Sequence, residues 1–209
     1  MTEATLRALA SAVFGGRCGF GLVRVDFADP AALLGEETDA LRTAIPARAR
    51  EFAAGRIAAR QALGRRLAIP MGRDRAPVWP QGWAGSISHA AGWAVAIARD
   101  GGALIGVDLE PDEDLPEDIL PEILTPAERM RLGADLRLAR RIFAIKEAVY
   151  TAQYPVTRQV FDFQTLEISL SESRFFAEFR HSVGPFARGS GISGGWASGG
   201  GLILAGVLD

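Results

Sequence analysis

Residues 85–110 have the sequence GSISHAAGWAVAIARDGGALIGVDLE, and their pattern predicts three short strands in succession. Small or β-branched apolar residues fill the runs 85–88, 93–98 and 104–110, as is typical of strands. Gly101-Gly102 separates the last two runs, and such a pair favours a hairpin turn. This segment therefore predicts short strands in a mainly antiparallel arrangement.

Helical patterns lie on both sides of this segment. Residues 46–67 are rich in alanine and have no proline after Pro46, so we expect one helix with Pro46 at or near its first position. A second long helix is predicted over residues 136–153. Between the two, Thr125-Pro-Ala-Glu128 has the spacing of a capping box and predicts the start of a short helix.

The rest of the chain has mostly strand-like patterns. Further strands are predicted over residues 20–27, 160–170, 174–181 and 202–208. Residues 189–201 are loaded with glycine and serine and predict a mobile surface loop. Each half thus offers a long helix and about three strands. The expected fold is α+β, with two pseudo-symmetric lobes (1–102 and 103–209), each a small mainly antiparallel sheet packed on a long helix.

The composition is that of an ordinary folded protein. The 209 residues are 48% hydrophobic and carry a net charge of −2, so nothing global favours nucleic acid or an anionic membrane as a partner. A single cysteine, Cys18, excludes an intramolecular disulfide and a cysteine-built zinc site. No signal peptide is evident, and the apolar run 202–208 is far shorter than the ~20 residues that span a bilayer. We therefore expect a cytoplasmic protein without a membrane segment.

Lysine is nearly absent, since the chain has 22 arginines and one lysine, Lys146. An ammonium group is a compact proton donor, which a guanidinium does not replace, so Lys146 is a candidate for a chemical role. Lys146 and Glu147 lie about 100° apart on the predicted helix and can reach one cleft. The alternative is a solvated Lys–Glu pair on an amphipathic helix.

Three carboxylates form a candidate metal site. Asp108 and Glu110 alternate along a predicted strand and point to one face, while Val107 points to the other. Such oxygen ligands suit Mg²⁺, and Glu147 would complete the set. The alternative is a strand end whose carboxylates are hydrated.

Two further groups are candidates for binding an anion. Ser88 and His89 end a predicted strand, where the imidazole can donate to a phosphate. Arg48, Arg56 and Arg60 fall within roughly a third of the helical wheel, and such a stripe suits bidentate phosphate contacts. A basic helix face is more often simply solvated.

Taken in order, these elements resemble the 4′-phosphopantetheinyl transferases, in particular the enterobactin-synthetase and surfactin-synthetase type. The matching segments are the arginine-rich helix at 50–60, Pro77-Val-Trp-Pro80, Gly85-Ser-Ile-Ser-His89, Gly106-Val-Asp-Leu-Glu110 and Lys146-Glu-Ala148. The resemblance implies a Mg²⁺-dependent enzyme that moves the 4′-phosphopantetheine arm of coenzyme A to a serine of an apo acyl or peptidyl carrier protein and releases 3′,5′-ADP.

The resemblance also implies roles for individual residues. Asp108, Glu110 and Glu147 would hold Mg²⁺, and Glu147, or a water that it holds, would accept the serine proton. Lys146 would stabilise or protonate the leaving phosphate. The coenzyme A contacts would come from Arg48, Arg56, Arg60, Arg75 (on the adenine side), Ser88, His89 and Lys146. Because both halves of the cleft occur in one chain, we expect a monomer.

One position departs from the family pattern. A second lysine usually follows the first by five residues, and Thr151 stands there in this chain. The alternatives are therefore a non-catalytic or weakened coenzyme A-binding homologue, and a Mg²⁺-dependent enzyme acting on another phosphate anhydride. The region around Arg129-Met-Arg-Leu132 is a candidate dock for the carrier protein, because carrier proteins are commonly acidic around their serine.

Overall fold

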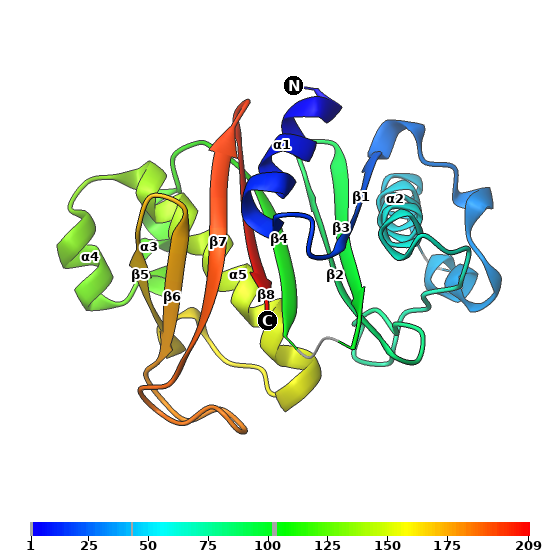
Figure 1. Cartoon of the computed structure of the whole chain (residues 1–209). Helices are drawn as coiled ribbons and strands as arrows, with labels where there is room; N and C mark the ends of the chain where they lie inside the picture. Colours follow the sequence, from blue (N-terminus) through cyan, green and yellow to red (C-terminus); the bar gives the residue numbers. More distant parts are fainter. Residues whose placement is uncertain (1, 43, 102–103) are drawn as a thin grey trace.

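The computed structural model describes residues 2–42, 44–101 and 104–209, which form two antiparallel sheets with a long helix against each (Figure 1). The first sheet has the strand order β1-β3-β2, formed by β1 (Gly19–Arg24), β2 (Trp83–Ala90) and β3 (Trp93–Asp100). The second has the order β4-β8-β7-β6-β5, formed by β4 (Ile105–Pro111), β5 (Leu166–Leu170), β6 (Arg174–Phe179), β7 (Gly191–Gly199) and β8 (Leu202–Leu208). The predicted α+β class is confirmed.

The long helices are α2 (Pro46–Leu63) and α5 (Leu136–Thr157). Pro46 stands at the first helical position as predicted, and α2 ends at Gly64, earlier than expected, because Gly64 adopts the left-handed conformation that stops a helix. The capping box at Thr125 and Glu128 is confirmed and begins α4 (Pro126–Leu132), which follows the single turn α3 (Leu120–Ile123).

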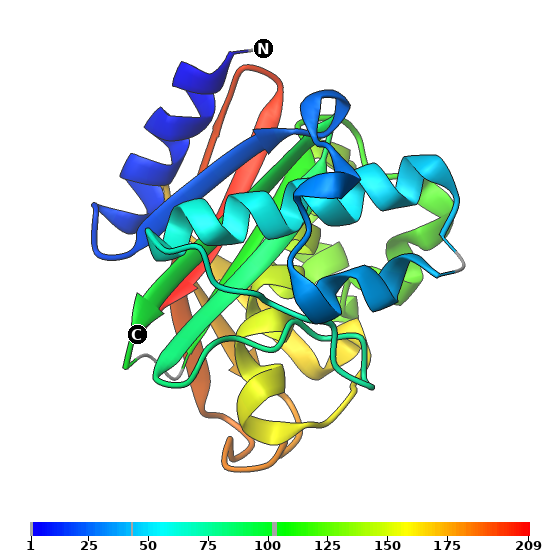
Figure 2. The same ribbon diagram turned by 90° about the vertical axis from the view of Figure 1, so that its right-hand side faces the viewer.

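Glycine lets each long helix approach its sheet closely. A Cβ at Gly21 of β1 would collide with the carbonyl of Ala58 on α2, and one at Gly106 of β4 would collide with the carbonyl of Ala148 on α5. Figure 2 shows α2 crossing the three strands of the first sheet. In both lobes a strand glycine thus allows the long helix to pack closely on its sheet. The boundary at residues 102/103 stays a prediction, since both positions lie outside the described residues.

Two strand predictions were wrong. β3 and β4 do not form a hairpin, because they belong to different sheets; the hairpin joins β2 to β3 through Ala91-Gly92, both at positive φ. Residues 191–199 are not a loop but β7, a central strand. Its glycines are required by packing, since a Cβ at Gly191 or Gly194 would meet a phenylalanine ring of β6.

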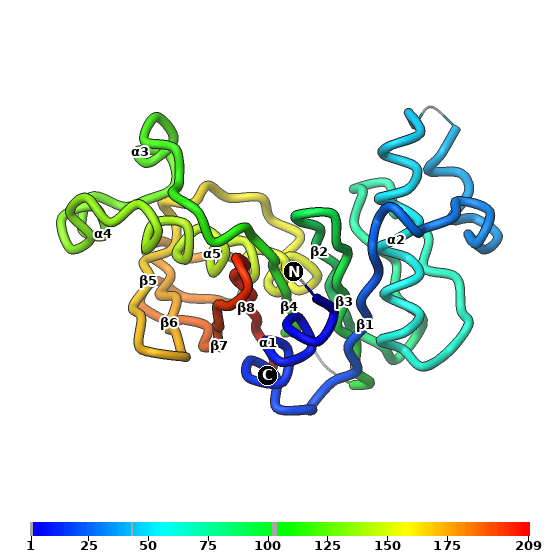
Figure 3. Tube along the Cα trace, turned by 90° about the horizontal axis from the view of Figure 1, so that it is seen from above, coloured from blue at the N-terminus to red at the C-terminus, as the bar shows by residue number. Residues whose placement is uncertain are grey.

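The N-terminal helix α1 (Glu3–Phe14), which the sequence analysis did not predict, lies against the junction of the sheets (Figure 3). It packs on β7 and β8, and its buried residues share one hydrophobic cluster with β1, β3 and β4. The two lobes therefore share a core. No helix in the described ranges is both long and apolar enough to cross a membrane.

Candidate functional site

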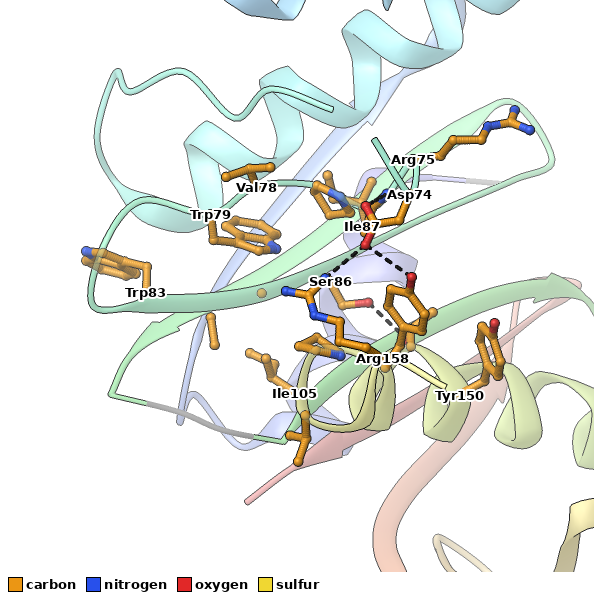
Figure 4. Close-up of a pocket in the computed structure, with 18 of the residues that line it drawn as sticks. Asp74, Arg75, Val78, Trp79, Trp83, Ser86, Ile87, Ile105, Tyr150 and Arg158 are labelled. Carbon is orange, nitrogen blue, oxygen red and sulfur yellow. Dashed lines mark hydrogen bonds and ion pairs between the residues drawn. The ribbon is translucent and has the colours of Figure 1, made fainter. Parts of the chain in front are cut away.

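A cavity of about 710 Å³ lies between the lobes (Figure 4). The first lobe supplies its walls from residues 74–79 and from β2, and the second lobe supplies Ile105 and the C-terminal half of α5. This volume is in the range of small-molecule and cofactor sites. The cavity is thus large enough to take a nucleotide-containing ligand.

Beside the cavity, β2 and β4 bring Ser88 and Asp108 together across the lobes. The Ser88 hydroxyl donates to Asp108 Oδ1 at 2.8 Å and accepts the backbone N–H of Leu109 at 3.1 Å. Ser88 therefore fixes one carboxylate oxygen of Asp108. The other oxygen, Oδ2, is buried and has no hydrogen-bond partner among the described residues.

Two of the three predicted metal ligands, Asp108 and Glu147, have a pKa that other members of the set raise. Burial and the charge of Glu110 raise the pKa of Asp108 well above its ordinary value, and Glu147 adds to this effect. Burial, followed by Glu110, also raises the pKa of Glu147. An orphaned carboxylate oxygen among mutually repelling carboxylates is an environment that a hard cation would stabilise, so the donor set fits Mg²⁺.

The carboxylates of Asp108, Glu110 and Glu147 are not arranged as metal ligands in this structure. Arg140 donates to Glu110 Oε2 at 3.0 Å, and in the described part of the chain no three His, Cys, Asp or Glu side chains are grouped closely enough to hold a metal ion. Burial raises the pKa of Glu110, and Arg140 opposes this. Glu110 thus has a cationic partner of its own in this structure.

Lys146, which the sequence predicts to meet a phosphate, is engaged inside the protein in this structure. Its side chain is 0% exposed, and the ammonium donates to Glu128 Oε2 at 2.7 Å and to the carbonyls of Ile123 and Phe163. All three of its protons are therefore used inside the protein. The alternative that Lys146 and Glu147 form a solvated pair is wrong, because Lys146 joins α5 to α4 through a buried ion pair with Glu128.

The predicted arginine stripe on α2 is also divided among internal contacts. Arg60 pairs with the buried Glu37 at 2.7 Å, and Arg56 is buried, donates to the carbonyl of Ile69 and lies over the ring of Phe52. Burial lowers the pKa of Arg56 to about 10. Neither guanidinium faces solvent as a free phosphate ligand.

Arg48 and His89 lie near each other at the start of α2. Arg48 is exposed and pairs with Glu51 at 3.0 Å. Nε2 of His89 lies 2.9 Å from the carbonyl oxygen of Glu51, and burial lowers the pKa of the imidazole. The structure therefore brings these two predicted anion ligands to one corner of the first lobe.

Other residues line the cavity itself. Arg75 and Thr151 are among them, and the Thr151 hydroxyl donates to the carbonyl of Ala148. A contact of Arg75 with the adenine stays a prediction. Asp74 and Tyr154, which no sequence pattern indicated as site residues, bond across the cavity at 3.1 Å. The helical spacing of Glu147, Thr151, Tyr154 and Arg158 indicates a shared face, but no pattern indicates the partner 80 residues away.

Comparison with known proteins gives a consistent result. A model of the 4′-phosphopantetheinyl transferase N-terminal domain matches residues 36–99, and one of the 4′-phosphopantetheinyl transferase superfamily matches residues 104–190. The 4′-phosphopantetheinyl transferase Svp of Streptomyces mobaraensis is 37% identical over 86% of this chain and 80% of its own length. PptT of Mycobacterium tuberculosis is 35% identical over 68% of each chain. Enterobactin synthase component D of Salmonella typhimurium is 41% identical over 54% of this chain and 52% of its own.

Proposed function

The chain belongs to the 4′-phosphopantetheinyl transferase superfamily, and we propose that it transfers the 4′-phosphopantetheine arm of coenzyme A to a serine hydroxyl of an apo carrier protein. The observation that carries this proposal is the position of the cavity, which both lobes line and which adjoins the acidic cluster. Tyr150 lines the cavity one helical turn from Glu147 on α5.

The reaction is an in-line displacement at phosphorus. The serine oxygen forms a bond to the phosphorus that carries the pantetheine arm, and the bond from that phosphorus to the oxygen of 3′,5′-ADP breaks. The serine proton goes to Glu147 or to a water that it holds. The raised pKa of Glu147 brings this carboxylate closer to the working pH of a general base.

Asp108, Glu110 and Glu147 would hold Mg²⁺, with Glu110 leaving its contact with Arg140. When bound, a hard divalent cation supplies charge neutralisation at the pyrophosphate. Ser88 keeps Asp108 oriented toward this cluster. His89 and Arg48 would grip a phosphate at the start of α2. Lys146 has no part in this proposal, because it is enclosed by protein.

A second candidate function is coenzyme A binding without turnover. The observation that favours it is that no lysine among the described residues reaches the cavity, since Lys146 is buried and Thr151 is uncharged. Carrier modification distinguishes the two candidates.

The test is the intact mass of an apo carrier protein incubated with the purified chain, coenzyme A and Mg²⁺. We expect a gain of one phosphopantetheine unit, lost with EDTA and lost by at least about 100-fold in rate with Glu147→Gln, in line with general-base catalysis. Glu117→Gln, which alters an exposed carboxylate in the 3-10 turn before α3, is the matched control and should keep full rate. Coenzyme A binding without any mass gain would instead establish the non-catalytic candidate.

Metal binding has a readout that is independent of turnover. Mg²⁺ should raise the Tm of the wild-type chain, and Asp108→Asn should remove this increase. An equal increase in both proteins would show that the cation binds elsewhere.

Three expectations remain predictions: a monomer, a cytoplasmic location, and carrier docking near α4. Met130 of α4 is 84% exposed beside the exposed Arg129, whereas Arg131 is held by Glu167. Arg129→Ala should therefore raise the Michaelis constant for the carrier more than Arg131→Ala does.

A further inference from the structure

We infer that Arg158 contacts a phosphate group of coenzyme A and that Asp74 holds its guanidinium until the ligand enters. The inference rests on the proposed function, because it names a binding residue for the same reaction. It concerns a residue at the end of α5, outside the acidic cluster and outside the arginines of α2.

Few side chains that line the cavity carry a positive charge. Coenzyme A carries a 3′-phosphate and a pyrophosphate, and a cavity that holds such a polyanion needs cationic groups. Among the described residues that line the cavity, Arg75 and Arg158 are the two with a positive charge. In Figure 4 the Arg158 side chain points into the cavity beside Ser86, whereas that of Arg75 points away from the cavity.

The other candidate cations are engaged elsewhere. Arg60 is paired with Glu37, Arg56 bonds the carbonyl of Ile69, and Lys146 is enclosed with Glu128. Thr151, two turns before Arg158 on the same face of α5, supplies no charge. Arg158 is therefore the cation of the second lobe that reaches this cavity.

The guanidinium of Arg158 can readily exchange its present partner, Asp74, for a ligand. Arg158 Nη1 lies 2.9 Å from Asp74 Oδ2, and Tyr154 donates to the same oxygen at 3.1 Å. The two charged side chains are 64% and 34% exposed. Solvent screens such a pair, so little free energy opposes its exchange for a phosphate, which offers the guanidinium two acceptor oxygens.

The backbone conformation of Arg158 also supports the inference. Arg158 caps α5 at φ 55°, in the left-handed region where glycine is the usual residue. A non-glycine residue is strained there, and such strain is concentrated at ligand-binding positions. The position therefore allows a matched test, because Arg158→Gly relieves the strain and removes the charge together.

The experiment is calorimetric titration of coenzyme A into the full chain and its variants. Arg158→Gln should weaken binding by about 10- to 100-fold, the loss of one charge-assisted phosphate contact. Arg158→Gly should weaken binding similarly while leaving the Tm equal to or above that of the wild type. Asp74→Asn, whose amide oxygen can still accept the N–H of Ala76, should tighten binding about threefold, because it removes an anion that competes for Arg158.

Two further variants complete the design. Arg188→Gln, which removes an exposed arginine outside the cavity, should bind as the wild type does. Thr151→Lys combined with Arg158→Gln should recover most of the lost affinity, because it returns a cation to the same wall. With 3′-dephospho-coenzyme A, a loss that persists in Arg158→Gln assigns the contact to the pyrophosphate, and one that vanishes assigns it to the 3′-phosphate.

The inference is overturned if the wild type binds coenzyme A and both Arg158 variants bind it with the same Kd. A wild-type chain that binds no coenzyme A would instead overturn the proposed function. The two failures are therefore separate.

Discussion

His89 carries a titratable group whose neutral form is favoured by burial. Its imidazole bonds the carbonyl of Glu51 and packs against Gly55, and burial lowers its pKa below the ordinary value of about 6.5. In the pH window below that ordinary value, the unfolded chain takes up a proton at His89 before the folded chain does. Folding stability from this group is therefore present above pH 6.5 and is lost as the pH falls.

We predict that the free energy of unfolding decreases between pH 7.5 and pH 5.5, with a contribution from His89 of up to about 1.4 kcal/mol per pH unit. Urea titrations at several pH values measure it. His89→Gln should flatten the profile, and the matched change His181→Gln, at an exposed position, should not. A His89→Gln profile as steep as that of the wild type would show that other groups control this window.

At single residues the sequence predicts chemical type better than partner. The family resemblance placed Asp108 and Glu147 near each other, and the contribution of Glu147 to the raised pKa of Asp108 agrees with this. It did not indicate the ion pairs of Lys146 and Arg60, because their partners Glu128 and Glu37 lie on separate elements whose positions only the folded chain defines. An ion pair between remote residues leaves no periodic pattern in a sequence.

Among the elements, α5 is attached to α4 by a buried ion pair. Lys146 and Glu128 are both 0% exposed, and Glu128 also accepts the backbone N–H groups of Thr125 and Ile168. Removing one partner leaves an uncompensated buried charge. We therefore predict that Lys146→Met lowers the free energy of unfolding by about 3–5 kcal/mol, as measured by urea denaturation.

The double variant Lys146→Met with Glu128→Gln separates structure from catalysis. It should recover part of the lost stability, and transferase activity should return with it if, as in the proposed function, Lys146 serves only to place α5. Arg137→Met, on an exposed face of the same helix, should change stability by less than about 0.5 kcal/mol. A double variant that is stable but inactive would restore a catalytic role to Lys146.

The packing of α5 on β4 sets the separation between Glu147 and Asp108. Gly106 permits it, since a Cβ there would collide with the backbone of Ala148. We predict that Gly106→Ala destabilises the fold by about 1–3 kcal/mol and slows transfer, because α5 must move away from the metal strand. Gly199→Ala is the control, since its new Cβ would meet Leu9 at an ordinary 3.6 Å. Equal Tm and equal rate in the two variants would contradict this account.

Some helices and strands were predicted correctly from the sequence and others were not, and the difference has a physical reason. β8 follows its apolar pattern over the predicted residues, and α2 begins where Pro46 indicates. β7 was missed because its glycines, which suit a loop by composition, are selected there by the phenylalanine rings of β6. α5 continues to Thr157, beyond the predicted end at residue 153, although residue 155 is a proline.

In the whole molecule, the two lobes share a hydrophobic core and together line an open cavity. α1 packs on the second sheet and shares a hydrophobic cluster with β1 and β3 of the first, so the lobes are held together away from the ligand. On the cavity side the lobes are joined by the exposed pair of Asp74 and Arg158, the bond from Tyr154 to Asp74, and the bonds of Ser88 to β4. Ligand binding should therefore order both walls of the cavity while the opposite side stays unchanged.

Amide hydrogen exchange tests this expectation. With saturating coenzyme A, we predict slower exchange in residues 74–79 and in the last two turns of α5 together, since both segments line the cavity. At 100 times the Kd, binding should add about 2.7 kcal/mol to the free energy of unfolding, which corresponds to a rise in Tm of about 5–10 °C for a chain of this size. Exchange in α1 and β7 supplies the internal control, because neither element lines the cavity. Protection confined to one wall would mean that the ligand binds a single lobe, and the assignment of the cavity as a shared site would then be wrong.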